Sequence, residues 1–449
     1  MYNVYNRVIF ANTKKAGTIT LEKIKITDGI TLNIINTDKF KTNYLSFNFV
    51  TPLSREKVSY YALIPQVLMR GTKSYNDLAS IKNKLDDLYA ASVEGRVYRR
   101  GEYQICGITA SWLMDKYAID GTNITDGTLD VLEEIIFTPF LENGVFSNSY
   151  VESEKKNLID DIRAIINNKN GYAIRRCQEE MCKDEAFGIC EYGEEAVVES
   201  ITSDELYRLY NELLETARVE IFYVGSGDMD KLCEKISKMF VDRERRYSEF
   251  KGAEVRKEVL QTKEVLEKCA TMQGKLSLGF RTGTVLGEDD YNAFPVFVEM
   301  YGNSPVSKLF MNVREKLSLC YYCRAIPEGI KGVMVVTSGI EVSKKQEAQD
   351  EILAQLECVR NGEFTEDELI LAKKSLKNAY DELNDSPASV ESWYLTRRLA
   401  GVDDETETVA RRFMDVTRED VIRVAKKIKL DTVYFLEGTM TGEVEDDDE

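Results

Sequence analysis

The sequence predicts an α+β fold made of two homologous tandem α/β-roll domains, each a mainly antiparallel sheet covered by helices. Three observations support this prediction. A length of 449 residues is enough for two or three domains, each with its own core. A segment of the first half recurs in the second half. Strand patterns adjoin through short turns while helical patterns come in blocks, which is typical of antiparallel sheets with helices on one face.

The internal repeat is read directly from the residues. Residues 45–72 and 276–303 align without gaps at an offset of 231 and share nine identities in 28 positions. The identical pairs are Leu45/Leu276, Ser46/Ser277, Phe49/Phe280, Thr51/Thr282, Tyr60/Tyr291, Ala62/Ala293, Val67/Val298, Met69/Met300 and Gly71/Gly302. With small shifts the match continues through Tyr89/Tyr321 and Thr202/Thr417. Both halves are therefore expected to share one fold.

The elements are expected in the same order in both halves. In the first half we predict strands at 24–35, 45–51, 89–98, 103–112 and 219–224, and helices at 56–70, 76–87, 125–182 and from Ser203. In the second half we predict helices at 344–360, 366–383, 389–399 and 418–428, with strands at 317–326 and 432–436. The charged stretch 241–257 has weak periodicity and is interpreted as the linker. The predicted domains are therefore 1–244 and 245–449, ending in a disordered acidic tail at 443–449.

The composition excludes several classes of function. The chain has no His, so it cannot by itself supply an imidazole-based zinc hydrolase site, a Ser-His-Asp triad or a Cys-His nucleophile. Its 59 basic and 77 acidic side chains give a net charge of −18, which argues against a nucleic-acid or anionic-membrane partner. No apolar stretch is long enough for a signal sequence or a membrane span, and we expect a cytoplasmic protein.

The cysteines indicate reduced thiols rather than a disulfide framework. There are nine, at irregular spacings, and Cys320-x-x-Cys323 is the one local pair. The favoured interpretation is that both are buried as small apolar residues in a strand. A metal or redox role remains the alternative, and it would need further thiols close in space.

The chain resembles the insulinase or pitrilysin family of zinc peptidases. The resemblance rests on the duplicated strand and helix, which end in Gly71-Thr72 in the first copy, and on the segment REKLSLCYY at 314–322 in the second copy. The resemblance covers essentially the whole chain. That family carries the inverted zinc motif H-x-x-E-H on the helix before the Gly-Thr pair. Counting back from Gly71, the two His positions are Ala62 and Gln66, and the Glu position is Pro65. The resemblance therefore implies a degenerate zinc site.

The third ligand of the family is a Glu that ends an E-x6-E pattern, best matched here by Glu154 to Asp161. Asp161 alone cannot hold zinc, because catalytic sites use three protein ligands. No metal or cofactor is therefore expected in this chain. Pro65 lacks a backbone N–H and crowds the carbonyl of Tyr61, at a cost of roughly 3 kcal/mol in a regular helix. We therefore expect a kink there.

A second family feature is present. The family places an Arg and a Tyr, seven residues apart, over the active site to bind substrate and stabilise the tetrahedral intermediate, and Arg314 and Tyr321 have this spacing. The alternative is that Tyr321, like its repeat partner Tyr89, packs against the sheet.

These residues lead to two hypotheses. The first is a non-catalytic, substrate-binding subunit of a heterodimeric bacterial zinc metallopeptidase. A partner chain of the same family would hold the zinc, and peptides or unfolded polypeptides would be the substrates. The second is a scaffold or structural family member with no peptidase role. In both, the isolated chain is expected to have no catalytic activity.

Overall fold

The computed structural model describes residues 7–8, 21–241 and 243–440, so the predicted acidic tail at 443–449 lies outside the described residues. The chain forms two compact units, and each unit contains segments from both halves of the sequence. Unit 1 comprises Met1–Arg163, Ile189–Lys251 and Ser386–Leu395. Unit 2 comprises Ala164–Gly188, Gly252–Asp385 and Thr396–Glu449. The division at residue 244 remains a prediction about the sequence repeat.

Unit 1 is built on a seven-stranded sheet. In spatial order its strands are β1 (Arg7–Val8), β2 (Leu21–Thr27), β3 (Ile30–Asn36), β9 (Arg218–Gly225), β4 (Thr42–Pro52), β6 (Tyr103–Leu113) and β5 (Ser92–Arg100). Strands β3 and β9 are parallel, and the other neighbours are antiparallel. The predicted strand at 24–35 is in fact the hairpin β2–β3, because Gly29 adopts a φ of 73° and reverses the chain.

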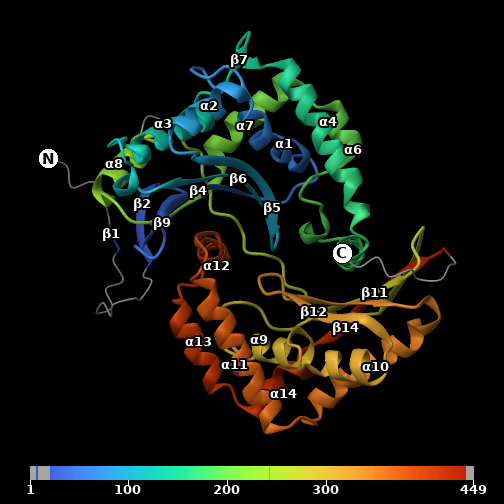
Figure 1. The fold of residues 1–449 in the computed structure, drawn as a ribbon. Coiled ribbons are helices and arrows are strands. Elements are labelled where there is room, and N and C mark those ends of the chain that lie inside the picture. Colours follow the sequence, from blue (N-terminus) through green and yellow to red (C-terminus); the bar gives the residue numbers. More distant parts are fainter. Residues whose placement is uncertain (1–6, 9–20, 242, 441–449) are drawn as a thin grey trace. The chain divides into compact units, whose positions relative to one another are not determined.

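Helices cover one face of this sheet (Figure 1). The helices of unit 1 are α1 (Val58–Leu68), α2 (Leu78–Asp87), α3 (Ile124–Phe137), α4 (Asn148–Ala164), α6 (Glu195–Ser200), α7 (Ser203–Thr216) and α8 (Met229–Lys238), with a small hairpin of β7 (Leu141–Glu142) and β8 (Val145–Phe146) between α3 and α4. Alternate residues of β4 point to opposite faces, so Leu45, Phe47 and Phe49 enter the apolar core under the helices.

Unit 2 repeats the strand order of unit 1. Its five-stranded sheet runs β10 (Lys263–Cys269), β14 (Lys429–Gly438), β11 (Gly274–Arg281), β13 (Val333–Ile340) and β12 (Cys320–Glu328). This order corresponds strand for strand to β3, β9, β4, β6 and β5. The first pair, β10 and β14, is again the parallel one. The prediction of two related α+β domains with mainly antiparallel sheets is confirmed.

The helices of unit 2 also follow the order of unit 1. They are α9 (Ala293–Val298), the π-helical turns η4 (Glu299–Asn303) and η5 (Phe310–Lys316), α10 (Lys345–Arg360), α11 (Glu366–Leu383), α13 (Thr406–Asp415) and α14 (Arg418–Lys427). Helices α9, α10 and α14 lie along one face of the sheet (Figure 1). Within the described part of the chain, no helix combines the length and apolar character needed to cross a membrane.

The opposite face of the unit 2 sheet is covered by α5 (Lys169–Met181), a helix from the first half of the sequence. The Cys177 thiol donates to the carbonyl of Ser277 at 3.6 Å. A Cβ on Gly279 would lie 2.9 Å from the sulfur of Met181, so glycine permits this close approach. Since both faces are covered, β11 and β13 are buried along almost their whole length.

A buried ionic cluster attaches the end of this segment to the same sheet. The Arg281 guanidinium binds Glu185 at 2.6 Å and Asp431 at 2.9 Å. The Lys331 ammonium, which is fully buried, lies 2.5 Å from the other oxygen of Glu185. Burial by itself raises the pKa of Glu185, but the hydrogen bonds and charges of Arg281 and Lys331 outweigh it and lower that pKa.

The corresponding helix of the second half is α12 (Pro387–Leu399), and its residues 387–395 belong to unit 1. There the Glu391 carboxylate accepts hydrogen bonds from the Asn48 amide at 2.9 Å and the Ser46 hydroxyl at 3.2 Å. Ser46 and Asn48 belong to the face of β4 opposite the apolar core. Burial raises the pKa of Glu391. Helices α5 and α12 therefore occupy matching places in the two units.

Candidate functional site

The three positions of the degenerate zinc motif lie on α1, against the sheet of unit 1. Ala62 and Pro65 are buried and Gln66 is half-buried. The methyl group of Ala62 and the ring of Pro65 offer no electron pair to a metal. The only polar side chain of the three, Gln66, donates its amide N–H to the backbone carbonyl of Gly95 on β5, at 3.4 Å. The residues present therefore do not fit a zinc ion.

Helix α1 continues through Pro65 from Val58 to Leu68. The proline leaves the Tyr61 carbonyl without its usual backbone donor. The buried thiol of Cys106 on β6 replaces that donor, at 3.1 Å. Burial raises the pKa of Cys106, so the thiol stays protonated and able to donate.

Strand β5 passes close to the same turn of the helix. A Cβ added to Gly95 would lie 3.0 Å from the carbonyl oxygen of Pro65 and 3.1 Å from its Cβ. The motif helix and the strand beside it are therefore in direct backbone contact at this point.

The carboxylates of α4 are placed differently from one another. Asp161 is exposed near the end of the helix. Glu154, two turns earlier, is buried and forms an ion pair with Arg70, which follows α1. The Asn157 amide donates to its second oxygen at 3.1 Å. Glu154 is therefore held by protein partners. Among the described residues, no three Cys, Asp or Glu side chains gather in a way that could hold a metal ion.

Arg314 lies in the π-helical turn η5 of unit 2. Its side chain is 44% exposed, and it makes a 3.5 Å ion pair with the neighbouring, half-exposed Glu315. The guanidinium carbon lies 4.8 Å from the ring centre of Phe310, one turn earlier. The cation is thus supported by a ring and remains open to solvent. Single π-helical turns often occur at functional positions.

Tyr321 lies at the start of β12, the edge strand of the unit 2 sheet. Cys320 is opposite Ile340 and Tyr322 is opposite Gly339, so Tyr321 is the extra residue of a β-bulge. Its side chain is 51% exposed. By contrast Tyr89 packs against the core of unit 1 and donates its hydroxyl to Asp120 at 2.8 Å. The packing role of Tyr89 is therefore not shared by Tyr321.

The chain between the two residues turns sharply. Ser318 adopts a left-handed φ of 48° just after η5 ends, and β12 begins two residues later. The neighbouring Cys323, then Ser338 and to a smaller extent the charge of Arg314 lower the pKa of the thiol of Cys320, the first residue of β12, against the opposing effect of burial. Arg314, Cys320 and Tyr321 therefore lie in one short segment around this turn.

The sequence interpretation missed the residues that make the degenerate motif stable. Cys106 and Gly95 lie on strands that were correctly expected, but nothing local in their surroundings indicates contact with Pro65. Glu154 was noted only as the start of the E-x6-E pattern. An Arg one residue before the Gly71-Thr72 pair was the available signal that this carboxylate has a partner.

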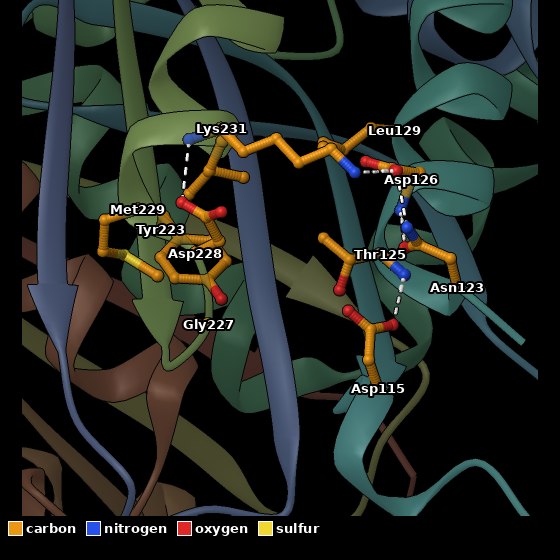
Figure 2. A pocket seen from close by; sticks show the side chains of 11 residues that line it. Asp115, Asn123, Thr125, Asp126, Leu129, Tyr223, Gly227, Asp228, Met229 and Lys231 are labelled. Atoms are coloured by element: carbon orange, nitrogen blue, oxygen red, sulfur yellow. Dashed lines mark hydrogen bonds and ion pairs between the residues drawn. The ribbon is translucent and has the colours of Figure 1, made fainter. Parts of the chain in front are cut away.

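A separate pocket of about 190 Å³ in unit 1 is lined by residues of α3 and α8 and of the segments before them (Figure 2). Its polar groups satisfy one another. Asp115 accepts from the backbone N–H of Thr125 at 2.8 Å, and Asp126 pairs with Lys231. Asp228 accepts from the first turn of α8 at 3.1 Å, as a helix cap. None of the predicted site residues lines this pocket.

Comparison with known proteins agrees with the fold and the lost motif. Residues 200–376 match the family described as Peptidase M16 inactive domain. The "Probable inactive metalloprotease YmfF" of Bacillus subtilis strain 168 is 35% identical over 411 residues, which cover 92% of this chain and 96% of that protein.

Two solved structures have the same fold. A conserved protein from Enterococcus faecalis V583 has a TM-score of 0.85 and 28% identity, covering 94% of this chain and 100% of that one. A peptidase M16 inactive domain from Pseudomonas fluorescens has a TM-score of 0.76 and 15% identity, with the same coverage of both chains. The chain therefore belongs to the M16 family of insulinase-type peptidases, as a member that lacks the zinc ligands.

Proposed function

We propose that this chain is the non-catalytic, substrate-binding subunit of a two-chain M16 zinc metallopeptidase that acts on peptides or unfolded polypeptides. A partner chain of the same family, with an intact H-x-x-E-H motif, would hold the zinc. One observation carries the proposal. Arg314 and Tyr321 are both exposed at one end of the unit 2 sheet, whereas the zinc positions on α1 are closed by contacts within unit 1.

The proposed roles follow from the chemistry of the two side chains. A guanidinium donates several hydrogen bonds in a fixed plane and keeps its charge at any physiological pH, so Arg314 would bind a peptide carbonyl as negative charge develops on its oxygen. The Tyr321 phenol would donate one further hydrogen bond to the same oxygen. Neither group needs to exchange a proton with the substrate. This chain would therefore orient and stabilise, while proton transfer would belong to the partner.

The exposure of both groups supports binding rather than packing. An Arg that served only stability would be expected to pair with a buried carboxylate, as Arg281 does with Glu185. Arg314 instead has one weak, exposed acidic neighbour. The bulge turns Tyr321 away from the regular alternation of β12, and β-bulges commonly re-aim a side chain next to an active site.

The test is purification of the tagged, full-length chain from its own host together with any M16 partner, followed by a peptide-cleavage assay of the complex. We expect Arg314→Ala to lower kcat about 100-fold, the magnitude found when one oxyanion donor is removed. Tyr321→Phe should lower it less, because the ring remains. Arg411→Ala, an exposed Arg elsewhere in unit 2, is the matched control and should leave kcat unchanged.

The scaffold hypothesis makes opposite predictions. A complex that copurifies without any peptidase activity, or that keeps full activity in Arg314→Ala, would contradict the proposed function. The Arg314→Ala variant must still form the complex for a loss of activity to support the proposal. If it no longer forms the complex, the substitution has acted on assembly and not on substrate binding.

A further inference from the structure

The segment Cys320–Cys323 at the start of β12 has a geometry that the substrate-binding proposal does not use. In a regular strand, residues three apart point to opposite faces of the sheet. The bulge at Tyr321 changes this alternation. Cys320 lies opposite Ile340 and Cys323 lies opposite Ser338, so both thiols are on one face, matched to positions two residues apart on β13.

That spacing is compatible with a covalent bond between the two sulfurs. Two residue steps along a strand are about 6.6 Å, which is within the upper part of the Cα–Cα range of disulfides. The two thiols are also near enough for each to shift the pKa of the other. Both residues are free cysteines in this structure.

The two thiols have unequal environments. Cys320 is half-buried. Its pKa is lowered by hydrogen bonding with Cys323, and further by Ser338 and the charge of Arg314, although burial acts in the opposite direction. Cys323 is 5% exposed, and its hydrogen bond to Cys320 and its burial raise its pKa well above the ordinary value. Burial also raises the pKa of Cys106, Cys177 and Cys182 elsewhere in the chain. An accessible thiolate beside a protected thiol is the usual arrangement of an attacking and a resolving cysteine.

We propose that Cys320 and Cys323 are a redox modification site, at which a low-molecular-weight disulfide such as oxidised glutathione converts the two thiols to a reversible intramolecular disulfide. The proposal stands on the geometry of β12 and does not depend on the proposed peptidase role.

The reaction is ordinary thiol–disulfide exchange. The Cys320 thiolate attacks one sulfur of oxidised glutathione, which forms a mixed disulfide and releases one glutathione thiolate. Cys323 then loses its proton to solvent and attacks the sulfur of Cys320, which releases the second glutathione thiolate. In total two cysteine thiols are oxidised and one glutathione disulfide is reduced to two thiols. Reduced glutathione reverses both steps.

The bond would close a small ring that contains the bulge. Tyr321 lies at the tip of this ring, and Tyr322 is tied to α5 through its hydroxyl, which donates to Asn170 at 2.7 Å. Oxidation would therefore restrict the position of Tyr321 and leave the rest of the sheet in place.

The experiment equilibrates the purified full-length chain in glutathione buffers of graded redox ratio, quenches by alkylation and maps the products by mass spectrometry. We expect a Cys320–Cys323 peptide lighter by two hydrogens, which disappears on reduction. Cys323→Ser should trap a glutathione adduct on Cys320, because the resolving thiol is gone. Cys320→Ser should give neither product. Cys269→Ser, at a half-buried cysteine of β10, is the matched control and should behave as the unmodified sequence does.

Two results would overturn the proposal. One is a stable glutathione adduct on Cys320 in the unmodified sequence, since Cys323 would then fail to resolve it. The other is persistence of both free thiols at ratios that oxidise a reference dithiol. A kinetic measurement provides an independent check: alkylation of Cys320 at neutral pH should be at least about tenfold faster than that of Cys323, because the thiolate is the reactive form.

Discussion

At the scale of single residues, Pro65 and Cys106 form a compensating pair. A proline inside a helix costs roughly 3 kcal/mol, in part because one carbonyl loses its donor. Here the carbonyl of Tyr61 is buried and cannot turn to water for a replacement. The Cys106 thiol supplies the missing hydrogen bond from a neighbouring strand. This contact explains how the helix that carries the zinc motif in active relatives persists with a proline at the Glu position.

This pairing predicts a specific non-additivity. Cys106→Ala should lower the free energy of unfolding by about 1–3 kcal/mol, because it leaves the buried Tyr61 carbonyl unsatisfied. In a Pro65→Ala background the same change should be milder by about 1 kcal/mol, since residue 65 then donates a helical hydrogen bond to that carbonyl. Urea unfolding followed by circular dichroism measures the four variants. Cys233→Ala, at a buried cysteine of α8, should cost the same in both backgrounds. Equal costs for Cys106→Ala in both backgrounds would rule out the pairing.

At the scale of elements, the segment Ala164–Gly188 shows how tertiary contacts place a helix. Its helix α5 packs on β11, β13 and β14, and its far end is attached through Glu185. The Glu185 carboxylate is an ion-pair partner of both Arg281 and Lys331. Removing its charge would leave two buried cations each without this partner, which destabilises the fold.

We therefore expect Glu185→Gln to lower the free energy of unfolding by about 3–5 kcal/mol at neutral pH, the usual cost of breaking a buried ion pair from one side. The sign of the pH dependence follows from the lowered pKa of Glu185. A carboxyl with a lowered folded pKa stabilises the fold above its unfolded pKa, near 4.5, and loses that contribution as the pH falls through the folded value. The difference between the two proteins should thus shrink in acid. Glu347→Gln, at an exposed Glu of α10, is the control and should show neither effect. A difference that stays constant from neutral pH into acid would contradict this account.

Element boundaries were predictable where the local signal is strong and were missed where it is weak. The amphipathic helices α7 and α11, which begin at capping threonines, appear close to the predicted positions. The long helices predicted between 125 and 182 are α3, α4 and α5, and the breaks between them, at the β7–β8 hairpin and at a turn over 165–168, were not located from the sequence. The edge strand β10 was missed because it is charged and largely exposed, so it has little apolar alternation.

At the scale of the whole chain, the five strands of unit 2 repeat the order of five strands of unit 1, each with one parallel pair, and among the described residues neither unit has three Cys, Asp or Glu side chains placed to hold a metal ion. The aligned residues Ser46 and Ser277 show the symmetry of the repeat. In unit 1 the Ser46 hydroxyl contacts Glu391 of α12, and in unit 2 the Ser277 carbonyl contacts Cys177 of α5. Each sheet is thus covered on this face by the equivalent helix, contributed by the other half of the sequence.

Because the chain has no His, we predict that the protein does not bind stoichiometric zinc. The purified, full-length chain, washed with a chelator and then dialysed against zinc, should retain much less than one zinc per chain and should cleave no peptide, because α1 offers no ligand set. Inductively coupled plasma mass spectrometry on the same samples gives the stoichiometry, with an M16 protein that has an intact H-x-x-E-H motif as positive control. One zinc per chain, lost in Gln66→Ala, would show that this description of the motif is wrong.

The sequence by itself determined the duplication, the α+β class and the loss of the zinc donors. Each of these depends on residue identity or on local periodicity, and a chain without His cannot regain those ligands by folding. Only the tertiary structure decided which helix covers which sheet and that β3 pairs with β9, from the other end of the first half. It also decided that the Cys106 thiol donates a hydrogen bond to the Tyr61 carbonyl. Finally, it placed a bulge that exposes Tyr321 and brings Cys320 and Cys323 to one face of β12. The physical reason is that register and facing are set by contacts between residues far apart in the chain, for which no local pattern of side chains provides a signal.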